Sequence, residues 1–346
     1  MSNMFAIAPD EFRSLPKVDL HRHLEGSLRL QTMLDVARKH GMTIPASVVR
    51  LSRLVQVQDE DNLTFENFLA KFNTLRMFYR SPDVIERITR EAIEDAAKDN
   101  VKYLELRFTP VALSRAERFP MHDVMDWVCE SAKNASKKYG VTVQLIASVN
   151  RHESVELAEQ VVWLSIDRRD KGIVAIDLAG NEARFPARPF LALFNEGRQA
   201  GLKLTMHAGE WGGPENVREA IEIFAADRVG HGVHVLDDPF TTALAREHNT
   251  PFEVCLTSNY QTGAVKALPQ HPAPKMIEAR LNVTFNTDDP SISQITLGNE
   301  YRVAVEDLKI PMDVLKERIL AGAQASFLPE VEKKKLVDAL KKEIIK

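Results

Sequence analysis

The chain lacks most of the features that mark secreted, membrane-embedded or nucleic-acid-binding proteins. Two cysteines are too few for a disulfide framework and lack the paired spacing of a zinc knuckle, so we expect a reduced, cytoplasmic setting. No apolar run approaches the ~20 residues of a membrane span, and no basic segment precedes an apolar one at the N-terminus, which predicts no signal peptide. Long basic runs are absent and the net charge is −4, which argues against nucleic acid or an anionic membrane as a partner.

The chain does contain eight short apolar runs rich in β-branched residues, separated by helical patterns. Near-continuous apolar runs are typical of strands buried on both faces of a parallel sheet. The runs cover residues 17–23, 101–109, 141–149, 172–180, 202–209, 227–232, 251–258 and 281–289. Eight strands alternating with helices predict the α/β class and a (β/α)₈ TIM barrel, as one domain over residues 1–346.

The segments between the runs carry helix start and stop signals. Ser27 is a candidate N-cap for a helix that stops at Gly41, and Ser81 followed by Pro82 begins the next long helix. Further helices are predicted over residues 185–200, 214–226, 237–248 and 272–280, with closing helices over 291–346.

One connection, residues 42–80, is far longer than a single helix requires. It carries four phenylalanines, Phe65, Phe68, Phe72 and Phe78. A long insertion of this kind is often a lid over a site, which makes Phe65 a candidate for substrate contact. The alternative is a pair of accessory helices whose aromatic face belongs to the core, because aromatic stripes usually pack.

Several polar residues stand at the ends of the predicted strands. His21 and His23 are two residues apart, so both point into the barrel at the end where barrel enzymes build active sites. His207 closes the fifth strand and Asp288 closes the eighth. Three histidines and a carboxylate from three strand ends would converge. Nitrogen and oxygen ligands without thiolate fit one divalent ion, with zinc as the first choice and iron, cobalt or manganese as alternatives.

Other residues at the same strand ends suit proton transfer or substrate contact. His231 is predicted to hold, or take a proton from, an activated water, unless it is a satisfied core histidine. Glu210 could shuttle protons, or it could be a helix N-terminal glutamate favoured by the macrodipole. Asp289 could bind substrate or cap the turn at Pro290. Gly180 would let a ligand approach the backbone, unless it is a plain turn glycine.

Six stretches together resemble the adenosine deaminase family of the barrel amidohydrolase superfamily. In family order they are HRHLEGS, AIDLAGNE, MHAGE, RVGHG, CLTSNYQTG and NTDDP, and they span residues 16–290. The resemblance implies a zinc barrel whose ligands are His21, His23, His207 and Asp288. It also implies that metal-activated hydroxide attacks purine C6 and ammonia leaves. In that reaction Glu210 would protonate N1 and His231 would orient the attacking water.

The resemblance also implies the substrate contacts. Asp289 would bond the N7 side of the purine, the Gly180 N–H would meet N3, and Glu25 would contact the ribose 5′-hydroxyl. Adenosine deaminases more often carry Asp at the positions of Glu25 and Asn181. These departures bear on the sugar, so adenosine or 2′-deoxyadenosine is favoured as the small-molecule substrate. A nucleoside enlarged at the 5′ position, such as aminofutalosine, and free adenine are the alternatives.

Two other classes of protein are disfavoured by the same residues. A purine-binding protein without activity would lack at least one ligand or proton-transfer residue, and none is missing. A two-metal barrel hydrolase would be favoured by a bridging lysine on the fourth strand, and residues 172–180 contain none.

Overall fold

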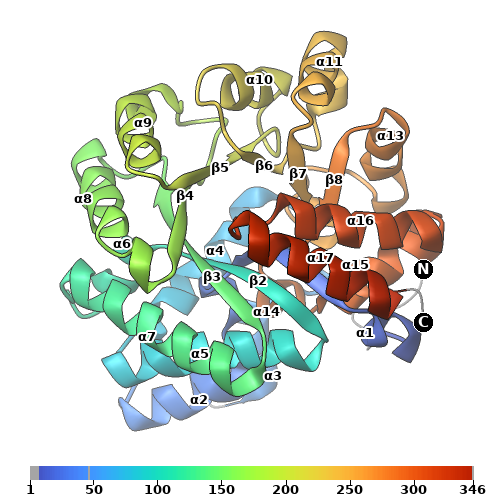
Figure 1. Cartoon of the computed structure of the whole chain (residues 1–346). Helices are drawn as coiled ribbons and strands as arrows, with labels where there is room; N and C mark the ends of the chain where they lie inside the picture. Colours follow the sequence, from blue (N-terminus) through green and yellow to red (C-terminus); the bar gives the residue numbers. More distant parts are fainter. Residues whose placement is uncertain (1–7, 46, 345–346) are drawn as a thin grey trace.

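Eight parallel strands form the centre of the computed structural model, which describes residues 8–45 and 47–344 (Figure 1). Each strand pairs with the next in the order β1 to β8, and a parallel bridge between Arg22 and Asp288 links the segment after β8 back to β1. The (β/α)₈ barrel is therefore confirmed. The strands are β1 (Lys17–His23), β2 (Val101–Phe108), β3 (Thr142–Asn150), β4 (Ile173–Ala179), β5 (Lys203–Ala208), β6 (Arg228–His231), β7 (Pro251–Val254) and β8 (Asn282–Phe285).

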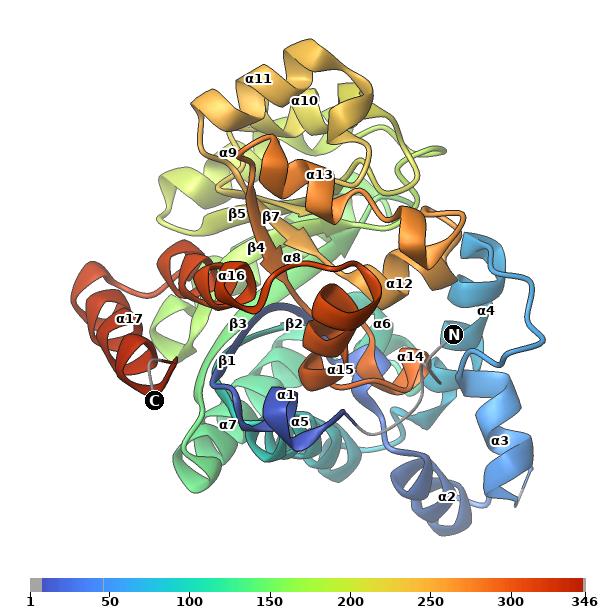
Figure 2. The same ribbon diagram turned by 90° about the vertical axis from the view of Figure 1, so that its right-hand side faces the viewer.

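Helices follow the strands and cover the outside of the barrel, as the two views in Figures 1 and 2 show. None of the described helices is long and apolar enough to cross a membrane. They are α1 (Asp10–Ser14), α2 (Leu30–Lys39), α3 (Val48–Val55), α4 (Phe65–Leu75), α5 (Pro82–Lys98), α6 (Pro110–Arg115), α7 (Met121–Tyr139), α8 (Val155–Ile166), α9 (Leu191–Gln199), α10 (Pro214–Glu222), α11 (Pro239–Glu247), α12 (Leu256–Gln261), α13 (Ala273–Glu278), α14 (Pro290–Ser293), α15 (Leu297–Arg302), α16 (Met312–Ala325) and α17 (Glu330–Ile344).

The last two predicted strands are too long. β7 ends at Val254, and the polar residues that follow it enter α12 instead of pairing with a neighbouring strand. β8 ends at Phe285, and the chain then turns through Asp288 over the mouth of the barrel. The two segments meet where Ser258 Oγ, after β7, donates to Asp288 Oδ2, after β8, at 2.6 Å.

Helix boundaries follow the sequence signals unevenly. Ser81 caps α5 as predicted, since its hydroxyl accepts from the Val84 N–H. Ser27 is not an N-cap: it lies in the 3₁₀ turn η1 (Glu25–Ser27), and its hydroxyl donates to the His23 carbonyl at 2.7 Å. α9 begins only at Leu191, because Pro189 lies in a preceding 3₁₀ turn, and α10 ends at Glu222, four residues before its predicted end.

The long connection after α2 forms α3, α4 and the 3₁₀ turn η2 (Arg76–Phe78). Figure 2 shows α2, α3 and α4 side by side along one side of the molecule, and α4 packs against η1. Phe78 is fully buried and belongs to the core, whereas Phe68 and Phe72 also line a cavity over the barrel. The segment therefore packs like accessory helices and covers the barrel mouth as well.

The described ends of the chain pack near β1 and β8. α16 contacts both strands and α17 packs on α16, so the C-terminal segment contains the closing helices that the sequence predicts. Residues 1–7, for which no signal peptide is predicted, lie outside the described residues.

Candidate active site

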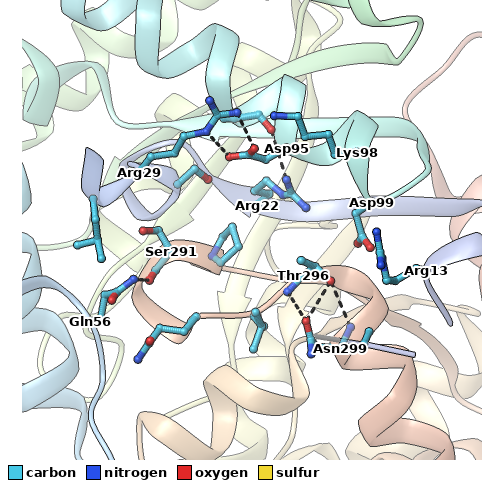
Figure 3. Close-up of a pocket in the computed structure, with 17 residues that line it drawn as sticks. Arg13, Arg22, Arg29, Gln56, Asp95, Lys98, Asp99, Ser291, Thr296 and Asn299 are labelled. Carbon is cyan, nitrogen blue, oxygen red and sulfur yellow. Dashed lines mark hydrogen bonds and ion pairs between the residues drawn. The ribbon is translucent and has the colours of Figure 1, made fainter. Parts of the chain in front are cut away.

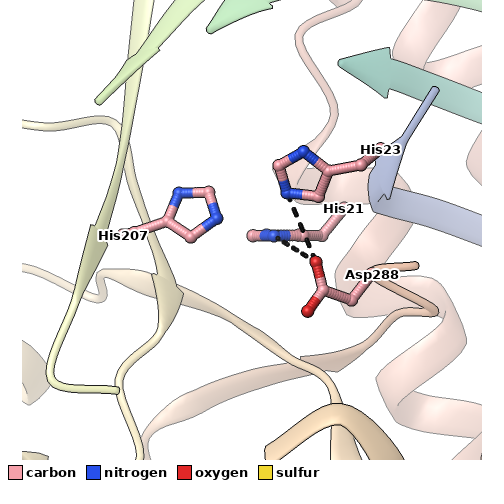
Figure 4. A group of neighbouring side chains, drawn as sticks. All are labelled: His21, His23, His207 and Asp288. Carbon is pink, nitrogen blue, oxygen red and sulfur yellow. Dashed lines mark ion pairs between the residues drawn. The ribbon is translucent and has the colours of Figure 1, made fainter. Parts of the chain in front are cut away.

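The four predicted metal ligands meet at the carboxyl ends of the strands. One donor atom from each of His21, His23, His207 and Asp288 lies within 4.8 Å of the others (Figure 4). The Asp288 Oδ1 atom is 3.4 Å from His21 Nε2 and 3.3 Å from His23 Nε2. The expected convergence of three histidines and one carboxylate is therefore present.

Two buried carboxylates orient two of these histidines. Glu253 Oε2 lies 2.7 Å from His21 Nδ1, and Asp177 Oδ1 lies 3.0 Å from His207 Nδ1. Burial opposes ionisation, but Arg107 and other cations hold the pKa of Glu253 well below its usual range, and His207 and Arg107 lower that of Asp177. An ionised carboxylate can only accept, so each Nδ1 donates and each Nε2 presents a lone pair to the centre.

The donor set fits a divalent cation. His21 Nε2 is buried and has no hydrogen-bond partner within residues 8–45 and 47–344, although it points at a carboxylate oxygen. A neutral imidazole nitrogen that faces carboxylate and imidazole acceptors gains nothing from them unless a cation stands between. Three imidazoles and a carboxylate are typical ligands of zinc and related ions, and here His21, His207 and Asp288 each have a further hydrogen bond that orients them.

Arg107 links the two orienting carboxylates, and neither it nor they were identified from the sequence. Its guanidinium donates to Glu253 Oε2 at 2.7 Å and lies 3.4 Å from Asp177 Oδ2, with all three side chains fully buried. The missed signal was a charged residue inside an apolar strand run, as in PFEV, AIDLA and LELRF. Charges are rarely buried unless they are paired, so each such residue predicts a partner inside the barrel.

The backbone at two site residues is left-handed. His231 has φ of 62° and Asp288 has φ of 61°, a region that costs a residue with a side chain roughly 1–3 kcal/mol. The Asp288 carbonyl accepts from the His23 N–H at 2.8 Å, and its Oδ2 accepts from Ser258 Oγ at 2.6 Å. These bonds hold Asp288 against that strain.

A chain of hydrogen bonds determines the tautomer of His231. The Ala273 N–H donates to His271 Nδ1 at 3.1 Å, so the His271 proton must be on Nε2. That nitrogen lies 3.4 Å from Asn259 Oδ1, and the Asn259 amide nitrogen lies 3.0 Å from His231 Nδ1. His231 Nδ1 therefore accepts, and its Nε2 carries a hydrogen that faces Glu210 Oε2 at 3.5 Å.

His271 also affects stability at acidic pH. Burial lowers its pKa to about 3, whereas an unfolded histidine titrates near ~6.5. Between these values only the unfolded state binds the proton, so this group lowers the free energy of unfolding by up to ~1.4 kcal/mol per pH unit of acidification. We expect a shallower loss in His271→Gln between pH 6.5 and 4.5, measured by urea unfolding. Equal slopes in the two proteins would contradict this account of His271.

Glu210 lies in the same cavity and is nearly fully buried. Its carboxylate accepts a hydrogen bond from Thr262 Oγ at 3.3 Å. Burial, followed by the charges of Asp288 and Glu182, raises the pKa of Glu210 well above its ordinary value. The helix that follows begins only at Pro214, with Gly213 as its N-cap, so Glu210 is not a helix N-terminal residue.

Glu182, also not identified from the sequence, holds the loop that carries Glu210. Its carboxylate accepts from the backbone N–H groups of Gly209, Glu210 and Trp211 at 2.9, 2.7 and 2.9 Å. Three backbone N–H groups bonded to one carboxylate fix the backbone of the loop, and with it the backbone position of Glu210.

Three of the four predicted substrate contacts line the same cavity. Glu25, Gly180 and Asp289 all face it, together with the four metal-ligand candidates except His21. Glu25 Oε1 accepts from the Thr109 N–H at 2.6 Å, whereas Glu25 Oε2 and Asp289 Oδ1 are buried without a partner in the described part of the chain. The Asp289 side chain does not cap the following turn. Burial raises the pKa of both carboxyl groups.

Helix α4, in the predicted lid, contributes side chains to the wall of this cavity. The volume of the cavity is about 90 Å³, well below the roughly 300–1,000 Å³ of a typical ligand pocket. Phe65 is not in its lining: its ring packs 5.1 Å from that of Trp211, and Phe68, Leu69 and Phe72 face the cavity instead. Residues of α4 therefore form part of the cavity wall, as expected if residues 42–80 cover the site.

A larger cavity of about 570 Å³ lies away from the histidines, between β1, α5 and the chain after β8 (Figure 3). Its charged side chains all have ionic partners, some within the lining and some outside it. Arg29 donates to Asp95 at 2.6 Å, and Arg22 donates to Asp19 at 3.0 Å. It contains none of the predicted site residues, and its satisfied charges leave no group aimed at a ligand.

The chain is similar in sequence and in fold to known deaminases. The family model described as Adenosine deaminase matches residues 16–343. An adenosine deaminase from Klebsiella pneumoniae (strain 342) is 36% identical over 331 residues, covering 95% of this chain and 98% of that protein. A Zn-bound amidohydrolase from Burkholderia ambifaria has a TM-score of 0.88 at 26% identity, with 96% and 91% coverage. Arabidopsis ADAL complexed with GMP has a TM-score of 0.86 at 27% identity, with 96% and 98% coverage.

Proposed function

Since this chain belongs to the adenosine deaminase family and is a hydrolytic deaminase, we propose that it acts on adenosine and 2′-deoxyadenosine. Water and the purine would yield inosine or 2′-deoxyinosine and ammonia. The observation that carries the proposal is a buried carboxyl group of raised pKa, Glu210, in one cavity with a three-histidine, one-aspartate cluster. Such a pair combines an acid with a site for a hydrolytic metal.

We propose zinc as the bound ion, held by His21, His23, His207 and Asp288. The donor set favours it, and one structural relative contains zinc. When bound, such an ion lowers the pKa of water toward ~7, which supplies hydroxide at neutral pH. Other divalent ions with the same ligand preference could substitute.

Glu210 would transfer protons, and His231 would orient the attacking water. Neutral Glu210 donates a proton to purine N1, which makes C6 more electrophilic as the water oxygen adds to it. The His231 Nε2–H donates a hydrogen bond to that oxygen and orients it. One proton of the water replaces the proton lost by Glu210, the other joins the amino group, and the C6–N bond breaks to release ammonia.

Three further residues would orient the substrate. Purine N7 only accepts hydrogen bonds, so Asp289 must donate to it, which agrees with its raised pKa. Gly180, whose φ is 93°, would direct its N–H at N3. Glu25 Oε2, which has no protein partner among the described residues, would accept from the 5′-hydroxyl. Phe65 would act from outside the lining, through Trp211.

The organisation of the chain follows from this assignment. We propose one catalytic domain over residues 1–346, with residues 42–80 as its lid. A cytoplasmic location is supported by two buried free thiols, Cys129 and Cys255, which show no disulfide chemistry.

The direct test is the ultraviolet spectrum of adenosine, 2′-deoxyadenosine and adenine with the zinc-loaded protein. We expect conversion of both nucleosides, loss of activity after chelation, and recovery when zinc is restored. Metal content measured in parallel should approach one ion per chain. A metal-loaded protein that changes the spectrum of none of these purines would refute the function.

A further inference from the structure

Arg76 stands at one end of the cavity with no partner for its charge. It is the one lysine or arginine among the described residues that line this cavity. Its Nε is buried without a hydrogen bond, and no carboxylate of residues 8–45 or 47–344 lies within ion-pair distance of its guanidinium. Buried donors normally have partners, so an unpaired guanidinium beside a binding cavity suggests that the partner arrives with the ligand.

The lid helix presents Arg76 to the cavity on the same face as its apolar residues. Leu69, Phe72 and Arg76 follow one another at helical spacing, and all three line the cavity. The guanidinium lies over the Phe72 ring, with its carbon 6.0 Å from the ring centroid. The apolar stripe would cover the purine and sugar, and it ends in a positive charge.

Glu25 identifies which end of the substrate faces this charge. Glu25 and Arg76 line the same cavity, and each has a buried polar atom, Glu25 Oε2 and Arg76 Nε, without a hydrogen-bond partner in the described part of the chain. They nevertheless form no ion pair in the described structure, so Arg76 does not simply neutralise Glu25. If Glu25 contacts the 5′ end of the ribose, Arg76 lies close to whatever extends from the 5′ carbon.

We propose that this end of the cavity binds an anionic group on the 5′ carbon of the nucleoside, donated to by Arg76. The substrate class would then include adenosine 5′-monophosphate and adenosines that carry a 5′-carboxylate. Guanidinium groups bind phosphate and carboxylate oxygens through paired N–H donors, and such charge-assisted bonds are the strong ones. This inference rests on the proposed function, since it places the purine as a deaminase would.

The test compares deamination of adenosine, adenosine 5′-monophosphate and adenosine 5′-carboxylate by the zinc-loaded wild type and Arg76→Met. We expect kcat/KM for at least one anionic substrate to equal or exceed that for adenosine. In Arg76→Met that value should fall by about 10- to 100-fold, because a charged hydrogen bond is lost, while adenosine changes less than about 3-fold. The two anionic substrates separate phosphate from carboxylate recognition.

Arg80→Met is the matched control. Arg80 lies four residues further on and pairs with Glu117 at 2.9 Å outside the cavity, so its loss removes the same charge without touching the site. It should leave all three substrates unchanged. The inference would be overturned if Arg76→Met reduced kcat/KM equally for adenosine and for its anionic analogues. It would also be overturned if the wild type did not deaminate either analogue. Neither result would contradict the deaminase function.

Product binding gives the same comparison without turnover. By calorimetry, inosine 5′-monophosphate should bind the wild type more tightly than inosine, and Arg76→Met should abolish the difference. Failure on every purine in the activity assay counts against the proposed function. Failure of this binding difference counts against the role of Arg76.

Discussion

Replacing Glu210 by glutamine should lower kcat by about 10²- to 10⁴-fold, the usual contribution of general acid–base catalysis. Glutamine matches glutamate in shape and can still accept from Thr262 Oγ, which lies 3.3 Å from Glu210 Oε1. It cannot release a proton to purine N1, so the loss should appear in kcat and not in KM or metal content. Steady-state kinetics and metal analysis of the purified variant provide the measurement.

The matched control is Glu215→Gln. Glu215 is exposed in the first turn of α10, five residues beyond Glu210, and it does not line the cavity. Its substitution should leave kcat unchanged. If Glu210→Gln turned over adenosine near the wild-type rate, another group would have to supply the proton.

Glu253→Gln should destabilise the fold and weaken metal binding together. Glu253 Oε2 accepts from His21 Nδ1 and Arg107, both at 2.7 Å, while Oε1 accepts from Arg228 at 2.5 Å and Thr205 at 3.0 Å. Removing the charge from a buried network that contains two arginines costs about 3–5 kcal/mol of unfolding free energy. Losing the partner that orients a ligand histidine costs about 10- to 100-fold in metal affinity.

Urea unfolding and metal titration measure the two effects separately. The matched control is Glu278→Gln, at an exposed glutamate in the last turn of α13, which should change neither quantity. A variant that lost stability but bound metal normally would show that Glu253 supports the barrel without orienting His21. A variant normal in both respects would contradict the network itself.

The metal cluster could be predicted from sequence because its geometry follows from strand periodicity. The carboxyl ends of all the strands in a barrel surround one opening. Once the strands were assigned, the proximity of His21, His23, His207 and Asp288 could therefore be predicted. Glu253 and Asp177 were within reach of the same reasoning. A charged residue in the middle of an apolar run lies inside the barrel and must have partners there.

Contacts made by loops and irregular turns were beyond that reasoning. His271 was not identified from the sequence, yet it is buried and joined to His231 through Asn259. No periodicity relates these three residues, because the path of the chain between α12 and α13 decides their distance. Ser27 was predicted to be an N-cap because a helical pattern follows it, but the chain first forms the turn η1.

One predicted substrate contact, in the helix that covers the barrel mouth, does not line the cavity. Phe65 was the expected lid contact, but the lining of the cavity comes from Phe68, Leu69 and Phe72. Phe65 shares a face of α4 with Leu69 and Phe72 but lies one and two turns before them, so the position of the helix along its own axis decides which of them reaches the cavity.

The hydrogen-bond chain behind His231 begins at a backbone amide, and this has an evolutionary consequence. Residues 272–274 read Pro-Ala-Pro, so the Ala273 N–H that bonds to His271 is the only backbone donor in that tripeptide. The flanking prolines leave the chain little freedom to turn this amide elsewhere. Any small residue except a third proline would preserve the bond. Lineages could therefore vary the side chain at 273 and still inherit the same tautomer at His231.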